Sequence, residues 1–245
     1  MFPLKDNIPT DRFPFVTVTL IALNVIVYLF LQDALLGLPD GGNGGDWPVG
    51  TYAFIPCEIT GDQPCRTAPG GPADWVTVFT AMFMHGSILH LGGNMLFLWI
   101  FGNNVEDSMG PVKFVIFYLL GGIAATAGQV LTDTGSEVAN LGASGAVAAV
   151  LGGYLLLFPR ARVITVVFII FFFTILELPA LVFLIIWFAQ QALFGYFDLV
   201  QPAGEGGGVA YFAHIGGFAF GLVAIKLFAS ERRRQRQIER VGGLT

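Results

Sequence analysis

The sequence predicts an all-α, polytopic membrane protein whose six transmembrane helices form a single membrane-embedded domain over residues 1–245. Two observations predict this class. Hydrophobic residues make up 55% of the chain and charged residues only 12%, with a mean hydropathy of +0.72, which is too apolar for an ordinary soluble domain. The charged residues also cluster in short blocks between long uncharged stretches, so they mark loops rather than one face of a water-soluble fold.

The six helices are predicted from stretches that are long enough to cross a bilayer. A helix needs roughly 20 mostly apolar residues to span roughly 30 Å of hydrocarbon. Six stretches qualify, at about 14–32, 86–104, 111–131, 142–158, 179–197 and 209–229. The first is too long for a signal-peptide core and lacks a small-x-small cleavage site, so we expect it to be retained. The fourth is the shortest and carries the most small residues.

The distribution of lysine and arginine orients these helices, because cytoplasmic loops retain basic residues and translocated loops do not. With six spans both termini share one side, and every basic residue except Arg66 falls on that side. The opposite loops are acidic. The sequence therefore predicts a cytoplasmic N-terminus (1–13), an extracytoplasmic loop (37–74) and a basic cytoplasmic tail (230–245). The short polar N-terminus without a transit sequence favours a bacterial plasma membrane.

Two segments do not fit the six-helix pattern. Residues 37–74 are rich in Gly and Pro, so we expect an ordered but irregular loop. This loop contains Cys57 and Cys65, which either form a disulfide, as an extracytoplasmic location permits, or remain a free pair. Residues 163–177 are apolar but end at Glu177, and a full crossing here would reverse the charge asymmetry downstream. A half-buried or interfacial segment is therefore predicted.

Small residues on two predicted helices point to a nucleophile and its base. The fourth helix opens with small residues, 142–149, around the single hydroxyl of Ser144, and the sixth carries His214 with Gly217 and Gly221. Such helices pack closely, which places Ser144 near His214. A serine hydroxyl becomes a good nucleophile when an adjacent imidazole accepts its proton. Because Ser144 also begins a helix, the free backbone N–H groups there can stabilise an oxyanion.

The second helix contributes a second group of polar side chains. His85, His90 and His214 all lie in or beside apolar segments, where a polar side chain is costly and suggests a function. His90 and Asn94 are four residues apart and share one helix face, so both can act at one polar site. Asn94 suits an oxyanion donor. Hydrogen bonding between helices is the alternative for each of these residues.

The remaining polar residues indicate which catalytic mechanisms the sequence allows. Asp198 and Glu205 fall in the loop before the sixth helix, so no acidic residue is placed to orient His214, and a Ser–His dyad is the economical prediction. The histidines do not form the HExxH helix of a zinc protease, and no carboxylates line the spans. We therefore expect neither a metal nor an organic cofactor.

Three separated motifs together resemble the rhomboid family of intramembrane serine proteases, over about residues 14–229. They are the second-helix motif from His85 to Met95, the nucleophile motif from Gly142 to Gly145 and the base motif from Ala213 to Gly221. Each motif is modest alone, and their order makes them specific. Further similarity, at Gly102, Glu106, Gly110 and Tyr118, falls at the family's junction between the second and third helices, where a structural role is expected.

The resemblance implies a role for each site residue. Ser144 is the nucleophile, His214 the general base and acid, and His90, Asn94 and the Ser144 backbone N–H are the oxyanion stabilisers. The implied partners are membrane-spanning protein substrates, cleaved near their outer end, and the surrounding membrane lipid. No nucleic acid is expected as a partner.

The sequence departs from the family pattern at two places. Some members carry a Trp-Arg pair in the first external loop, whereas here Trp47, Trp75 and Arg66 are separate, so substrate gating is expected to differ. Ala148 stands one turn after Ser144, where some members place an aromatic ring against the histidine. Other contacts are therefore expected to hold His214.

Two alternative functions remain. A rhomboid-like pseudoprotease would bind membrane helices without cutting them, although both reactive residues are present. A small transporter or channel could use buried His and Asn along an ion path, but the intramembrane charge that a coupled transporter usually needs is missing.

Overall fold

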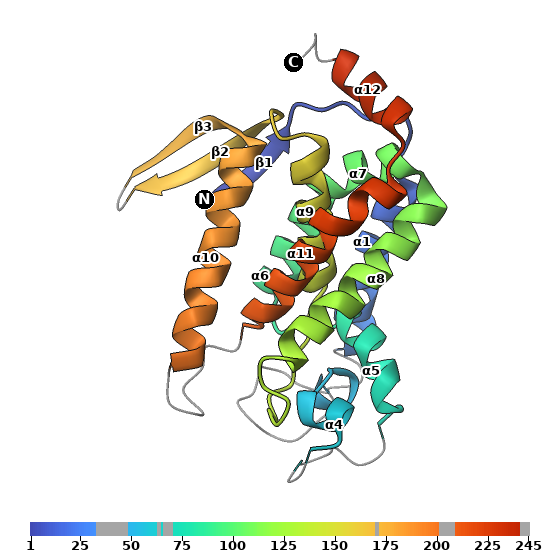
Figure 1. Ribbon diagram of the computed structural model, residues 1–245, viewed down its shortest axis with the longest axis vertical. Coiled ribbons are helices and arrows are strands. Elements are labelled where there is room, and N and C mark those ends of the chain that lie inside the picture. The colour runs from blue at the N-terminus through green and yellow to red at the C-terminus, as the bar shows by residue number, and fades with distance from the viewer. Residues whose placement is uncertain (33–48, 63–64, 66–70, 170–171, 201–208, 241–245) are drawn as a thin grey trace.

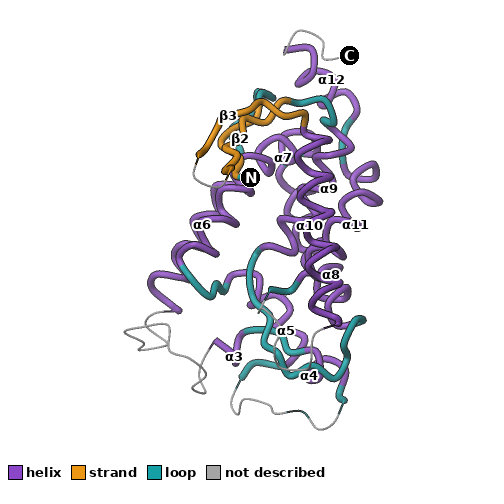
Figure 2. The backbone as a smooth tube through the Cα atoms, turned by 90° about the vertical axis from the view of Figure 1, so that its left-hand side faces the viewer, coloured by secondary structure: helices purple, strands orange, loops and turns teal. Residues whose placement is uncertain are grey.

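The structure is a computed structural model that describes all residues except 33–48, 63–64, 66–70, 170–171, 201–208 and 241–245. A helical bundle stands between two differently built ends (Figures 1 and 2). One, here called the sheet end, holds β1 (Phe2–Asp6), β2 (Arg162–Ile169), β3 (Phe172–Pro179) and α12 (Glu231–Arg240). The other, here called the disulfide end, holds α3 (Val49–Tyr52), α4 (Pro56–Thr60), α5 (Asp74–Thr80) and the 3-10 turn η2 (Ala81–Phe83).

All six predicted stretches coincide with helices, which confirms the helical membrane class. They are α1 (Phe15–Ile26) with the π-helical turn η1 (Val27–Gln32); α6 (Ile88–Phe97) continuing through η3 (Leu98–Gly102) into α7 (Asn103–Met109); α8 (Pro111–Val130); α9 (Ser144–Leu157); α10 (Ala180–Val200); and α11 (Tyr211–Phe228). Four of the described helices are long and apolar enough to cross a membrane, and a fifth is counted if Asp74–Phe83 and Ile88–Met109, bent by 82°, form one span. The short one is α9, with 14 residues. Asp198 lies within α10, so its predicted place in a loop was wrong.

Helix α9 is at the centre of the bundle and is buried on nearly every side. Its neighbour α11 approaches it closely. A Cβ atom added to Gly217 would collide with the carbonyl oxygen of Gly145, and one added to Gly221 would collide with that of Ala149. Because only glycine fits at these contacts, the close packing predicted from the small residues is confirmed.

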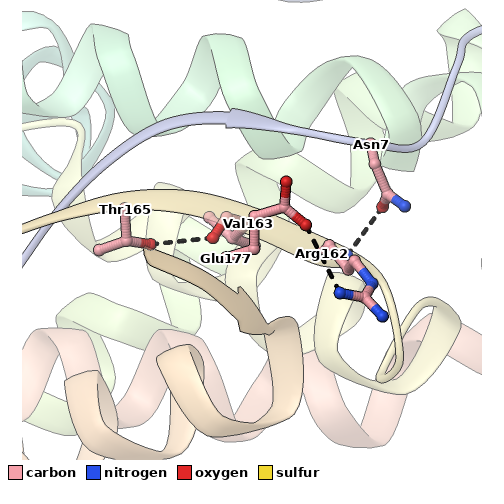
Figure 3. Close-up of polar contacts among 5 residues, drawn as sticks. All are labelled: Asn7, Arg162, Val163, Thr165 and Glu177. Atoms are coloured by element: carbon pink, nitrogen blue, oxygen red, sulfur yellow. Dashed lines mark hydrogen bonds and ion pairs between the residues drawn. The ribbon is translucent and has the colours of Figure 1, made fainter. Parts of the chain in front are cut away.

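A three-stranded antiparallel sheet, in the order β1-β2-β3, was not predicted. The apolar run at 163–177 forms most of the β2–β3 hairpin, and its β-branched and aromatic residues suit strands. The N-terminal segment pairs with β2 as β1, and beyond the pairing the Arg162 backbone N–H donates to Asn7 Oδ1 at 2.7 Å (Figure 3). The exposed Arg162–Glu177 ion pair, at 3.5 Å, bridges β2 and β3 in the same view.

Helix α7 and the N-terminus of α1 adjoin the sheet end and are counted with it below, and two buried carboxylates join these elements. Glu106 on α7 accepts hydrogen bonds from the backbone N–H groups of Val16 and Thr17, at 3.0 and 2.8 Å, and from the Thr17 hydroxyl at 2.8 Å. It thereby caps the N-terminus of α1, where free N–H groups favour an anion. Asp6 of β1 accepts from Asn104 Nδ2 at 2.6 Å and from the Tyr154 hydroxyl at 2.5 Å.

The disulfide end fixes the segment that leads into α9. Cys57 and Cys65 form a disulfide, which resolves the alternative left open by the sequence. The segment before Cys57 pairs with the segment before α9 through an antiparallel bridge between Phe54 and Asn140. Gly142, with a φ of +126°, then donates its N–H to the carbonyl oxygen of Ala81 at 2.8 Å. Ser144 therefore follows a turn that is held on both sides.

Candidate active site

Ser144 is the first residue of α9, directly after the turn at Gly142. Its neighbours in the helix are small, so other groups can approach the backbone of this turn closely. The first N–H groups of any α-helix lack intrahelical partners, and here they surround the serine. The predicted nucleophile and the free N–H groups thus share one helical turn.

His214 in the first turn of α11 faces this serine. Its Nε2 lies 2.8 Å from Ser144 Oγ, which is hydrogen-bonding distance. The two residues are 70 positions apart in sequence and meet because α9 and α11 pack backbone to backbone at their glycines. The structure therefore brings together the two residues predicted as nucleophile and base.

The second-helix residues lie on the opposite wall of the same site. Ser87 caps α6 by accepting the His90 backbone N–H at 3.1 Å. The His90 ring lies against the turn before Ser144, since a Cβ added at Gly142 would stand 2.8 Å from its Cε1 and Nε2 atoms. Asn94, one turn further, is buried and its Nδ2 has no hydrogen-bond partner within the described part of the protein. It remains available as a donor.

His85 is separate from the Ser–His pair. Its ring is fully buried, stands edge-on to His90 with centroids 5.1 Å apart, and neither ring nitrogen has a partner among the described residues. Its backbone is held instead, because Gln32 at the end of η1 donates to the His85 carbonyl oxygen and accepts the His85 N–H. His85 thus supports His90 and fixes the bend before α6.

A cavity of about 260 Å³ connects Ser144, His214, His90 and Asn94 and lies between four helices. Its lining comes from α6 (Leu89, His90, Gly93, Asn94, Phe97), α9 (Ser144, Val147, Leu151), α10 (Trp187, Gln191) and α11 (His214). Apart from the histidines, no titratable side chain is part of this lining. Within the described ranges, no three His, Cys, Asp or Glu side chains gather as a metal site would require. The site is polar, has no Asp, Glu, Lys or Arg in its described lining, and is bordered by apolar walls.

Comparison with known proteins places this geometry in a family. Residues 72–231 match the family model described as the Rhomboid domain, which covers the second-helix, nucleophile and base motifs together. The chain belongs to the rhomboid family. It is therefore a membrane protein of that family, as its apolar helices independently indicate.

Curated relatives of this rhomboid protein come from mitochondria and bacteria. It is similar to the mitochondrial Rhomboid protein 1 of Saccharomyces cerevisiae, with 30% identity over 68% of this chain and 46% of that protein. It is also similar to the rhomboid protease GluP of Bacillus subtilis, with 35% identity over 58% of this chain and 24% of that protein. A third is the mitochondrial presenilin-associated rhomboid-like protein A of Danio rerio, with 30% identity over 38% of this chain and 25% of that protein. The matches cover less than half of each relative's length.

Two residues of this rhomboid site were missed in the sequence. Gln191 on α10 is buried, and its Oε1 lies 2.8 Å from His214 Nδ1. Trp187, one turn earlier, places its ring 6.0 Å from the His214 ring, centroid to centroid. Ala148 supplies no aromatic ring against His214, and these two contacts from α10 hold the histidine instead. Such other contacts were expected from the sequence. The available signal was a polar Gln190-Gln191 pair inside an apolar span.

Other predicted positions are distant or undescribed. Trp75 lies in the first turn of α5 and is exposed, whereas Trp47 and Arg66, named above in the expectation about substrate gating, lie outside the described residues. Glu205 lies outside them as well, and so do parts of the 37–74 loop and the last residues of the 230–245 tail.

Proposed function

We propose that the protein is an intramembrane serine endopeptidase that cleaves membrane-spanning segments with a Ser144–His214 dyad. The observation that carries this proposal is the 2.8 Å contact between Ser144 Oγ and His214 Nε2, at a helix N-terminus beside a cavity. Membership of a family that includes a rhomboid protease supports it. Each further step below follows from the chemistry of these side chains.

The reaction proceeds by acyl transfer. His214 Nε2 takes the hydroxyl proton as Ser144 Oγ attacks the scissile carbonyl carbon, whose π electrons move onto its oxygen. Collapse of this tetrahedral intermediate breaks the C–N bond, and the protonated His214 gives its proton to the leaving amine. Water then attacks the acyl-enzyme by the same route and regenerates Ser144. No step requires a metal or an organic cofactor.

The developing oxyanion has three proposed donors. They are the Ser144 backbone N–H, Asn94 Nδ2 and the His90 ring. The first stands at a helix N-terminus, and the second is a buried donor with no described partner. A donor left unsatisfied in the ground state gains a full hydrogen bond only when the oxyanion forms, so it lowers the barrier rather than the substrate KM.

The substrates are proposed to be membrane protein helices that unwind locally. A helical peptide bond engages its carbonyl in a hydrogen bond, so the segment must open before Ser144 can attack. The cavity between α6 and α10 is where such a segment would lie. Beside Ser144, a separate space of only about 20 Å³, lined by Met82, Gly142 and Gly145 among others, favours a small side chain next to the scissile bond.

The membrane arrangement is part of the same proposal. Residues 1–245 form one membrane-embedded domain with both termini cytoplasmic, in a bacterial plasma membrane, so the sheet end faces the cytoplasm and the disulfide end the outside. The strongly basic α12 at the sheet end and the disulfide at the opposite end both support this orientation. Cleavage then occurs near the outer end of the substrate helix.

The test is cleavage of a single-span substrate by purified protein in liposomes. Wild type, Ser144→Ala and His214→Ala are compared, with Ser136→Ala, in the loop before α9, as the serine control. We expect cleavage and fluorophosphonate labelling by wild type and Ser136→Ala, loss of cleavage in both dyad variants, and no effect of a chelator. Folded wild type that neither cuts nor labels would instead favour a helix-binding pseudoprotease. Ion flux that survives Ser144→Ala would favour a transporter.

A further inference from the structure

The Nδ1 side of the His214 ring has a partner of its own. Gln191 on α10 is 8% exposed, and its Oε1 lies 2.8 Å from His214 Nδ1, on the side of the ring away from Ser144. Its neighbour Gln190 is exposed, so only one of the two adjacent glutamines faces the site. Gln191 on α10, His214 on α11 and Ser144 on α9 thus form a continuous line of hydrogen-bonding groups.

This contact bears directly on the tautomer of His214. To accept a proton from Ser144, Nε2 must carry none, so the neutral ring must hold its proton on Nδ1. An amide oxygen at 2.8 Å accepts a hydrogen bond from Nδ1–H and so favours that tautomer. The reversed amide would present Nε2 of Gln191 and would favour the opposite, unreactive tautomer. The orientation of one amide group therefore favours or disfavours the tautomer in which His214 can act as a base.

We infer that Gln191 is a positioning residue and the third member of a hydrogen-bonded chain Ser144–His214–Gln191. This inference rests on the proposed function. During the reaction the serine proton moves to Nε2, while Nδ1 keeps its proton throughout and Gln191 neither gains nor loses one. The amide oxygen accepts from Nδ1–H in the neutral ring and in the imidazolium alike. A neutral acceptor also avoids placing a carboxylate among apolar helices, where a charge is costly.

Helix α10 provides a second contact that supports the same role. Trp187 lies four residues before Gln191 and therefore on the same helix face. Its ring is 6.0 Å from the His214 ring at an interplanar angle of 38°, so it restricts ring rotation. Both residues also line the cavity proposed to receive the substrate. A substrate segment in that cavity would therefore contact the helix that holds the base.

The experiment compares three variants of the full chain in liposomes, and thermal unfolding checks that each is folded. Gln191→Met keeps the side-chain length but removes the acceptor, Gln191→Glu restores an acceptor oxygen, and Gln190→Met is the matched control at the exposed neighbour. We expect Gln191→Met to lower kcat about tenfold with KM changed less than about twofold, as loss of one hydrogen bond predicts. Fluorophosphonate labelling should slow in parallel. Gln191→Glu should recover most of the rate, and Gln190→Met should match wild type.

Several outcomes would overturn the inference. Wild-type kcat in Gln191→Met would do so while the proposed function stands, whereas a wild type that neither cleaves nor labels would remove the proposed function itself. A loss confined to KM would assign Gln191 to packing or substrate binding. If Gln191→Met does not fold, ¹⁵N NMR of the wild-type His214 ring gives the answer. A neutral ring protonated on Nδ1 supports the inference, and one protonated on Nε2 contradicts it.

Discussion

Buried polar side chains occur both around Ser144 and at the sheet end, and the two groups differ in how their hydrogen bonds are satisfied. Asn94 Nδ2, beside the cavity at Ser144, and both ring nitrogens of His85, which packs against His90, have no partner among the described residues. At the sheet end, Glu106 accepts three hydrogen bonds and Asp6 accepts two. Asn104 Oδ1 and Gln237 Oε1 there also lack described partners, so the contrast concerns the carboxylates.

The paired carboxylates at the sheet end join structural elements, whereas Asn94 keeps a buried donor without a described partner beside the cavity. The described lining of the cavity beside Ser144 contains no acidic side chain, whereas Glu106 places a carboxylate at the N-terminus of α1. Substitutions at the sheet end should therefore change the free energy of unfolding, whereas substitutions beside Ser144 should change kcat.

The largest expected effect is on stability, at Glu106. Glu106→Ala would leave the N–H groups of Val16 and Thr17 and the Thr17 hydroxyl without their acceptor, at a cost of about 3 kcal/mol or more in the free energy of unfolding. Glu177→Ala, which removes an exposed carboxylate, is the matched control and should cost no more than about 1 kcal/mol. Thermal unfolding in detergent measures both. Equal stability of the two variants would mean that Glu106 is not a structural cap.

The next effect is on the rate, at Asn94. Asn94→Ala should lower kcat about 100-fold, the usual loss for one oxyanion donor, and should leave the unfolding temperature nearly unchanged because Nδ2 bonds none of the described residues. Asn24, a buried asparagine whose Nδ2 donates to the Leu20 carbonyl oxygen at 2.8 Å, is the control. Asn24→Ala should lower stability but preserve kcat. The assignment of Asn94 as a donor fails if its variant is unstable but fully active.

The sequence predicts the elements of this fold whose signal is long or repeated. Six apolar stretches locate the helices, and the glycines of α9 and α11 predict both their close packing and the approach of Ser144 to His214. The hairpin at 163–177 was missed because a short apolar run has the same composition in a strand as in an interfacial helix. Strand pairing with residues 2–6 depends on contacts more than 150 positions apart, which no local pattern reports.

The polar partners of the site were harder to predict than its reactive residues. Ser144 and His214 stand in motifs with small neighbours, whereas Gln191 stands in an apolar helix, and its role depends on which way that helix faces His214. The residue beside His214 Nδ1 is a neutral amide rather than an acid, so the absence of a nearby Asp or Glu in the sequence did not reveal it. Asp6 was overlooked for a similar reason, because its burial is created by α7 and α9 and not by its own segment.

The smallest expected effect is a pH dependence of stability that comes from Asp6. Burial raises the pKa of Asp6 from 3.8 to about 7, although the hydrogen bond from Tyr154 opposes the shift. The folded protein therefore retains a proton that the unfolded chain has lost, so the free energy of unfolding falls as the pH rises between these values, by at most about 1.4 kcal/mol per pH unit. Above about pH 7 this contribution is lost completely and the dependence levels off.

Asp6→Asn removes the titration and keeps an oxygen that can accept from Asn104 and Tyr154. The difference in unfolding free energy between variant and wild type should therefore grow, in favour of the variant, between pH 5 and pH 7 by about 1 kcal/mol or more. Other titrating groups contribute equally to both proteins and cancel in that difference. Asp133→Asn, in an exposed loop, is the control and should show no such trend. A difference that is independent of pH would mean that Asp6 is ionised in the folded protein throughout this range.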